Sequence, residues 1–257
     1  MPETGKEFER LMELIARLRG DNGCPWDREQ TPATIKRYLL EEVYEVVDAV
    51  DQQDSAQVAD ELGDLIFMAI FLAHLYQEQS EFDMAQVLRR VGEKMVRRHP
   101  HVFGDRKVDS ARQVKLNWEK IKQQEKPAKP LGARLNDIPR ATPALMRSYR
   151  AISRLGRALR RPLNHQAVVS ELRQTFSVLL QLKINGDQHP SAALLGKLLL
   201  LIVAFAFPAG IRAEEALTEA LESFCDQVKR LEATLVEQGK NLQDLTEAEE
   251  QSLWKNF

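Results

Sequence analysis

The sequence is poor in cysteine, with Cys24 and Cys225 as its two cysteines in 257 residues. Two cysteines are too few for a disulfide framework, and their spacing matches no zinc motif. A reduced, cytoplasmic environment is therefore the simplest expectation. The chain also lacks a basic excess, because its formal net charge is −2 and its pI is about 6.3. This balance argues against a dedicated nucleic-acid-binding protein.

Membrane spans, secretion signals and strands are also not expected. The most apolar stretch, residues 194–210, is interrupted by Lys197 and lacks the ~18 clean apolar residues of a spanning helix. We expect a buried core helix there. The first residues, MPETGKEFERLMEL, are charged and helical in pattern, unlike a signal peptide. Period-two alternation, the mark of half-buried strands, is missing, so the sequence predicts an all-α protein.

Capping residues mark the helix boundaries of the first half. Side-chain oxygens of Ser, Thr, Asp and Asn satisfy the free amides at a helix start. They predict starts at Thr31, where Pro32 follows, at Asp54 or Ser55, and at Asp83. These helices should reach about residues 51, 79 and 98, and another is expected over about 110–125. The turn-rich stretch 21–30 before Thr31 is expected to be a loop.

A proline-rich stretch, KPAKPLGARLNDIPRATP, separates two helical halves. We expect residues 1–126 to form one helical-bundle domain, 127–142 a linker and 143–257 a second, tandem bundle. Helical patterns in the second half cover about 143–160, 165–184, 190–207 and 213–237. A short last helix should begin at Thr246, which forms a predicted capping box with Glu249.

Two clusters of carboxylates lie on neighbouring predicted helices: Glu41, Glu42 and Glu45 on the first, Glu61 and Asp64 on the second. A helix advances about 100° per residue, so each cluster occupies one arc of its helix. If the helices are antiparallel, all these acids can converge, and they then repel one another unless a cation lies among them. Oxygen ligands at this density suit Mg²⁺ or Mn²⁺.

A solvated acidic surface is the alternative, because acid pairs on helices are usually exposed. The neighbouring residues weigh against it. Apolar side chains surround the first cluster, and the run from Leu62 to Leu72 is almost unbroken and of a buried type. Acids beside such a run need a partner, since an unpaired buried charge is costly.

Basic residues end the helix predicted from Asp83, and one tryptophan lies in the loop before Thr31. Lys94 and Arg98 share a helix face, and Arg97 lies beside them. They suit phosphate binding, although a basic helix end that complements the helix dipole is the alternative. Trp26 is either a hydrophobic plug under the bundle or a stacking surface for a base.

Four motifs together resemble the MazG family: GCPWDxxQT, LEExYE, ELGDL and RRHPHVF, between residues 23 and 103. The match is dense over 20–125 and continues through 137–139 and 143–146. The resemblance implies two related helical domains, a homodimer, and Mg²⁺ held by the EExxE and ExxD acids. It also implies hydrolysis of nucleoside triphosphates to monophosphate and diphosphate.

The leading hypothesis is a Mg²⁺-dependent nucleoside triphosphate pyrophosphohydrolase that uses the first domain, with no membrane partner. Glu41 is either a further metal ligand or the base that orients the attacking water, and Glu45 is the other catalytic candidate. The alternative is a catalytically weak nucleotide-binding or regulatory protein. The proposed metal ligands are Glu42, Glu45, Glu61 and Asp64, and the proposed substrate-binding residues are Trp26, Lys94, Arg97 and Arg98.

The second half resembles the family's second domain but has lost the motif residues. The sequence LGKLL stands where the motif would read LGDLL, so Leu194 and Lys197 replace the glutamate and the aspartate. The EAL at 215–217 aligns with the family's EAL turn, which puts Ser223 and Gln227 at the phosphate-binding positions. Because the apolar scaffold remains, we expect this half to fold without a metal site.

Overall fold

The computed structural model describes residues 2–125, 129–184 and 192–255. These residues form twelve α-helices and no strand, which confirms the all-α prediction. The chain divides into two compact units, Met1–Pro127 (unit 1) and Ala128–Phe257 (unit 2).

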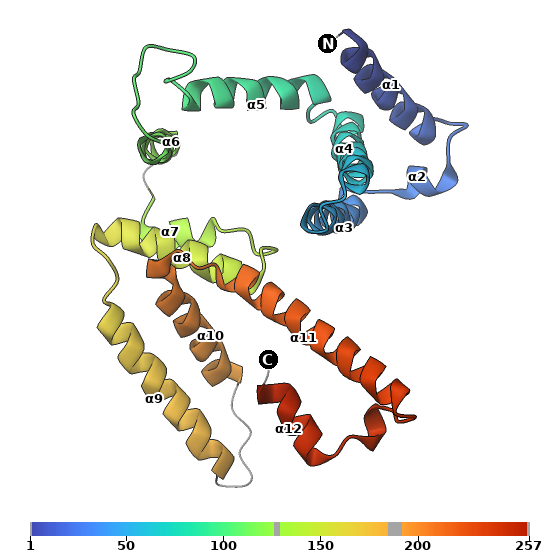
Figure 1. Ribbon diagram of the computed structural model, residues 1–257. Helices are drawn as coiled ribbons and strands as arrows, with labels where there is room; N and C mark the ends of the chain where they lie inside the picture. Colours follow the sequence, from blue (N-terminus) through green and yellow to red (C-terminus); the bar gives the residue numbers. More distant parts are fainter. Residues whose placement is uncertain (1, 126–128, 185–191, 256–257) are drawn as a thin grey trace. The chain divides into compact units, whose positions relative to one another are not determined.

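Capping residues begin the helices of unit 1 as the sequence predicts. Thr31, Asp54 and Asp83 are the N-caps of α3, α4 and α5, and their side-chain oxygens accept backbone N–H hydrogen bonds of 2.7–3.3 Å. The helices of this unit are α1 (Pro2–Arg19), α2 (Pro25–Glu29), α3 (Pro32–Asp51), α4 (Ser55–Glu78), α5 (Met84–Arg98) and α6 (Ala111–Gln124) (Figure 1).

The core of unit 1 lies where the start of α3 and the end of α4 meet α1 and α5. Its buried residues are Ile15, Ile35, Ile70, Phe71, Ala73, Leu75 and Met84. The other end of the α3–α4 pair is thinly covered, and Leu62 and Ile66 are 41% and 46% exposed. The expectation of a buried run from Leu62 to Leu72 is therefore wrong at its start. Besides α3, the helices α1 and α5 pack on α4, and these two cover its later turns.

The stretch 21–30, expected to be a loop, contains the short helix α2. Pro25 takes the first helical position, where its missing N–H costs nothing. Arg19 of α1 donates to the backbone carbonyls of Asp27 and, at 3.3 Å, of Gln30. The same guanidinium pairs with Glu78 of α4 at 2.7 Å. Arg19 thus joins the end of α1 both to α2 and to α4, through tertiary contacts that local periodicity does not reveal.

In unit 2, α8 and α10 are the central elements. α10 packs against α8, α9 and α11, while α7 and α11 pack on α8. The predicted capping box is confirmed, because Thr246 N–H donates to Glu249 Oε2 at 2.9 Å and Glu249 N–H donates back to Thr246 Oγ1 at 3.3 Å. The elements are α7 (Leu131–Asn136), α8 (Ala144–Leu159), α9 (His165–Ile184), α10 (Ala192–Ala206), η1 (Phe207–Ala209), α11 (Ala213–Glu237), η2 (Leu242–Asp244) and α12 (Glu247–Lys255). Of these, α7 falls inside the range 127–142 for which we predict a linker.

The helix α10 is not the buried core helix that its composition predicts. Val203 is its one buried residue, and Leu199 and Phe205 are each 49% exposed. By length and composition alone, residues 192–209 are apolar enough to cross a membrane, with a mean hydropathy of 2.2, and 6% of that stretch is buried. A single such helix is weak evidence for a membrane span. Composition reports how apolar a helix is but not what covers it.

Candidate functional site

The α3–α4 pair brings carboxylates of both helices together. One ligand oxygen from each of Glu42, Glu45 and Glu61 lies within 4.8 Å of the others. Asp64 follows Glu61 by one helical turn, and its negative charge acts on Glu42. Glu41 is exposed and does not belong to the group of three. The predicted acids of the two helices therefore converge, with Glu41 outside the group.

The surroundings of one of these acids, Glu42, raise its pKa. Burial raises the pKa of Glu42 above its usual value, and the negative charges of Glu45, Asp64 and Glu61 raise it further. Mg²⁺ takes oxygen ligands at about 2.0–2.1 Å in octahedral geometry, so its ligand oxygens lie about 3–4 Å apart. The spread of the group, at most 4.8 Å, closes to that range by small side-chain rotations. Spacing and donor type both fit a hard divalent cation.

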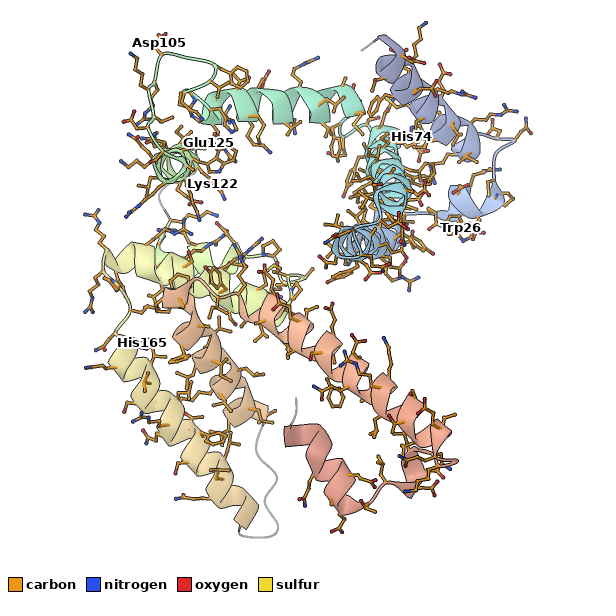
Figure 2. The ribbon with its side chains drawn as sticks, viewed as in Figure 1. Trp26, His74, Asp105, Lys122, Glu125 and His165 are labelled. Atoms are coloured by element: carbon orange, nitrogen blue, oxygen red, sulfur yellow. The ribbon has the colours of Figure 1, made fainter. Side chains whose placement is uncertain are left out.

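The predicted phosphate-binding residues lie at the C-terminal end of α5. Arg97 Nε and Arg98 Nε donate to the carboxylate of Glu125, at 2.8 Å and 3.0 Å. Glu125 directly follows α6 and is labelled in Figure 2. Its hydrogen bonds with Arg98, and then with Arg97, lower the pKa of Glu125 to about 2. Lys94 is half-buried, and no carboxylate in the described chain pairs with it.

Two neighbours of these arginines, Trp118 and Glu125, are not predicted by the sequence. The guanidinium of Arg98 lies over the ring of Trp118 at 5.4 Å, and His99 meets the same ring edge-on at 4.8 Å. Glu125 lies 28 positions after Arg97 and 27 after Arg98. No local pattern links residues so far apart, so only the packing of α5 on α6 reveals these contacts.

The acids and the arginines form two separate groups within one chain. Met84, at the start of α5, belongs to the core around α4. From there α5 runs toward α6, so its arginine end lies beside α6 and not beside the α3–α4 carboxylates (Figure 1). The proposed metal-binding acids and phosphate-binding cations therefore do not meet inside a single copy.

Trp26 lies on α2 and is 49% exposed (Figure 2). Its ring meets Tyr38 of α3 edge-on, with 5.7 Å between the ring centroids. It is therefore not a buried plug, and about half of its surface remains open.

Unit 2 carries an ion pair where the motif acids are missing. Lys197 Nζ of α10 lies 2.7 Å from Glu171 Oε2 of α9. In the described part of unit 2, no three His, Cys, Asp or Glu side chains come together as they do at Glu42.

Comparison with known proteins places these features in a family. The family model of the MazG nucleotide pyrophosphohydrolase domain matches residues 30–103, which contain all the predicted metal ligands. A crystal structure of a mazG-related protein from Thermotoga maritima is 34% identical, covers 45% of this chain and 98% of that chain, and has a TM-score of 0.40.

Two relatives match along nearly the whole chain. The nucleoside triphosphate pyrophosphohydrolase of Escherichia coli K12 is 35% identical over 97% of this chain and 96% of its own. The nucleoside triphosphate pyrophosphohydrolase/pyrophosphatase MazG of Thermotoga maritima is 34% identical over 95% and 93%. With this identity over nearly its full length, the chain belongs to the MazG family of nucleotide pyrophosphohydrolases.

Proposed function

We propose that unit 1 converts a nucleoside triphosphate and water to the monophosphate and diphosphate with the help of Mg²⁺. Family membership makes the chain a nucleoside triphosphate pyrophosphohydrolase, and our proposal adds the metal and the unit that carries catalysis. The observation that carries it is the convergence of Glu42, Glu45 and Glu61 within 4.8 Å. The described residues of unit 2 have no counterpart.

In this proposal Glu42, Glu45, Glu61 and Asp64 hold the cation. When bound, Mg²⁺ would neutralise phosphate oxygens and lower the pKa of a bound water. Glu41 is exposed and outside the group of three, which suits it to accept a proton from the attacking water. The carboxylates also keep the site negative until a cation binds, so metal and triphosphate are expected to bind together.

Lys94, Arg97 and Arg98 would neutralise the triphosphate, because charge stabilisation dominates phosphoryl transfer. In the free chain Glu125 already occupies the two arginines. A phosphate offers a guanidinium the same bidentate geometry as a carboxylate, so binding exchanges one for the other. The open half of Trp26 supports a stacking contact with the base.

We further propose a homodimer in which α5 of one copy serves the acids of the other. Two observations support it: the separation of arginines from acids in one chain, and exposed apolar side chains on α3 and α4. The latter include Val43, Tyr44, Val47, Leu62 and Ile66. Such side chains in a continuous patch usually mark a protein interface.

Subunit mixing tests this arrangement. Asp64→Asn and Arg98→Ala chains should each be inactive alone. A mixed dimer would contain one site with neither substitution, so mixing should restore part of the activity. No gain on mixing, with heterodimers demonstrated, would mean that each site is completed within its own chain.

We also propose a cytoplasmic location without a membrane partner. Cys24 and Cys225 are free in the structure, as expected in a reducing compartment. Because residues 192–209 are apolar enough to span a membrane, cell fractionation is the direct test. Recovery in the membrane fraction after a high-salt wash would contradict the proposal.

The central experiment is a panel of nucleoside and deoxynucleoside triphosphates with Mg²⁺, in an assay that separates pyrophosphate from phosphate. We expect pyrophosphate release that stops with EDTA. Lys94→Ala and Arg98→Ala should weaken binding of every base about equally, since these groups contact phosphate. Nucleotide binding without pyrophosphate release would favour the alternative, a catalytically weak nucleotide-binding or regulatory protein.

A further inference from the structure

A strongly basic segment lies at the start of unit 2. Residues 129–161 contain nine basic residues and one acid, Asp137, in a chain whose net charge is −2. Four of the arginines, at 147, 150, 154 and 157, follow one another on α8 at spacings of three and four residues. Like charges at these spacings repel across a helix face. The chain therefore concentrates positive charge here against a local cost.

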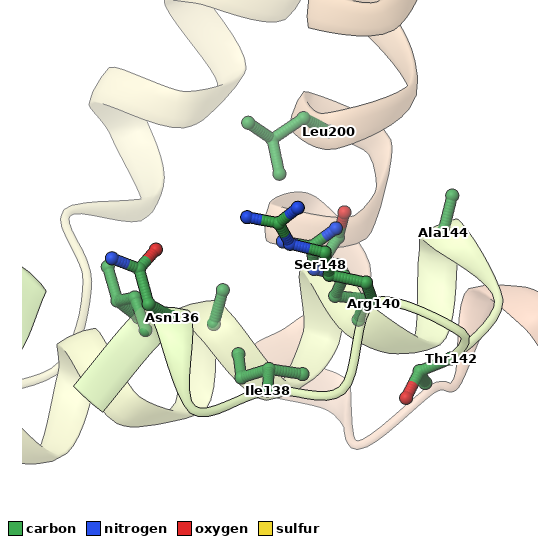
Figure 3. A pocket seen from close by; sticks show the side chains of 10 residues that line it. Asn136, Ile138, Arg140, Thr142, Ala144, Ser148 and Leu200 are labelled. Atoms are coloured by element: carbon green, nitrogen blue, oxygen red, sulfur yellow. The ribbon is translucent and has the colours of Figure 1, made fainter. Parts of the chain in front are cut away.

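This segment lines a cavity of about 390 Å³. Arg140 and Arg147 reach it together with the polar side chains of Asn136, Thr142 and Ser148, and its lining contains no acid. Figure 3 shows Arg140 lying between Leu200 and Ile138. The cavity thus joins two guanidinium groups and neutral hydrogen-bonding groups to an apolar wall.

The nearby carboxylates are already engaged elsewhere. Asp137 pairs with Lys129 at 3.1 Å. Glu214 of α11 accepts the backbone N–H of Met146 at 3.1 Å and so caps the start of α8. Within the described chain, no ion pair involves Arg140 or Arg147. The same excess of charge acts on Arg154, whose pKa is lowered first by burial and then by neighbouring arginines, against the opposing charge of Asp137.

We propose that this cavity in unit 2 binds a nucleotide, a site separate from the acidic site of unit 1. Guanidinium forks match phosphate oxygens in bidentate geometry. The hydroxyl and amide groups suit a sugar, and the wall of Ile138, Ala151 and Leu200 suits the flat apolar face of a base. The volume falls in the usual range for small-molecule sites, about 300–1,000 Å³. A long polyanion would need an extended groove instead, whereas Arg140 and Arg147 line a cavity.

Binding of AMP and ADP to the full-length chain, measured by calorimetry in EDTA, tests the proposal. EDTA removes the contribution of a metal at unit 1, and the Arg98→Ala substitution weakens phosphate binding by its basic residues. In the Arg98→Ala chain we expect binding to persist. Adding Arg140→Ala and Arg147→Ala should then weaken it about tenfold or more. Arg150→Ala and Arg160→Ala, basic residues of the same segment outside the cavity lining, are the matched controls and should change affinity less than about twofold.

Further probes decide between ligand classes. Arg140 is exposed and outside the helices, so Arg140→Ala alone tests the site without endangering the fold. Pyrophosphate should bind more weakly than ADP, because it lacks the part that meets the apolar wall. The proposal is overturned if AMP and ADP do not bind, or if folded cavity variants bind as the parent does. It is also overturned if single-stranded oligonucleotides bind more tightly than ADP and all the arginine variants weaken binding alike.

Discussion

The helix pairs α3–α4 and α9–α10 carry different charges at corresponding places. In α3–α4, Glu42 of the first helix is close enough to Asp64 of the second to respond to its charge. Glu45 and Glu61 extend the same negative group. Within the described residues no ion pair joins these acids to a basic side chain, so the carboxylates raise each other's free energy until a cation arrives.

In α9–α10, Lys197 stands at the position that the motif resemblance assigns to an aspartate, and it pairs with Glu171 at 2.7 Å. Glu171 thus lies opposite Lys197 as Glu42 lies opposite Asp64. In this pair an ammonium group faces a carboxylate, whereas carboxylates face one another in α3–α4. This pair contains its own cation.

The difference in charge changes what each helix pair requires. In our proposal the acidic pair with Asp64 binds an external cation as part of its chemistry. With Lys197 the positive charge is covalently attached and repels Mg²⁺. We expect the ion pair of Lys197 and Glu171 to stabilise α9–α10 slightly and to make a bound metal ion unnecessary there.

The largest expected effect is on catalysis. Asp64→Asn or Glu45→Gln removes one negative charge from the site, and we expect Mg²⁺-dependent turnover to fall at least about a hundredfold. Far-ultraviolet circular dichroism should show that the fold persists. The measurement is pyrophosphate release at saturating Mg²⁺.

Lys197→Ala is the matched control for this loss, at the corresponding place in unit 2. It should leave turnover nearly unchanged, because the first unit carries the chemistry in our proposal. Full activity in both acid variants would remove the metal assignment. A large loss in folded Lys197→Ala would mean that unit 2 takes part in catalysis.

The next effect concerns the whole of unit 2. A fragment ending near Lys129 should keep the metal site but lose stability or its oligomeric state. The reason is the exposed apolar surface of α10, including Leu195, Leu199 and Phe205, which is suited to an interface. Solution mass and activity of fragment and full-length chain, side by side, give the answer. A stable, fully active fragment of unchanged subunit number would show that unit 2 serves neither purpose.

Local sequence signals account for most of the fold and for part of the site. Caps at Thr31, Asp54 and Asp83 act within a few residues, so they can be recognised directly. The same is true of the acid motifs, whose members share a helix face. The pairing of Glu125 with Arg97 and Arg98 spans 27–28 positions and leaves no such signal.

Two further features depend on tertiary contacts. The short helix α2 forms where Arg19 holds its carbonyl groups, and its sequence alone resembles a loop. The exposure of α10 depends on which elements surround it, whereas its composition only shows that it is apolar. The ion pair of Glu171 is with Lys197, which lies 26 positions later and on another helix, so no local pattern predicts it.

A smaller effect distinguishes the arginine end of unit 1 from its acidic site. The pKa of Glu125 is about 2 in the folded chain, against an ordinary value of 4.5. A lowered folded-state pKa contributes stability above pH 4.5, and this contribution is lost as the pH falls toward about 2. The wild type should therefore lose its advantage over Glu125→Gln across that window, as measured by denaturant unfolding. A difference that stays constant with pH would mean that the ion pair does not form in solution.

The smallest expected effect has opposite signs in the two helix pairs. In the metal-free chain at neutral pH, Glu42→Gln relieves repulsion and should raise stability by up to about 1 kcal/mol. Glu171→Gln removes the half-exposed pair with Lys197 and should lower stability by about 0–1 kcal/mol. Adding Mg²⁺ should stabilise the wild type and Glu171→Gln equally, since a ligand stabilises the state that binds it. Glu42→Gln should gain less, so its rank against the wild type reverses with metal. Thermal unfolding of the three proteins with EDTA and with Mg²⁺ measures this. If both variants shift alike in each condition, the two helix pairs do not differ in their need for a cation.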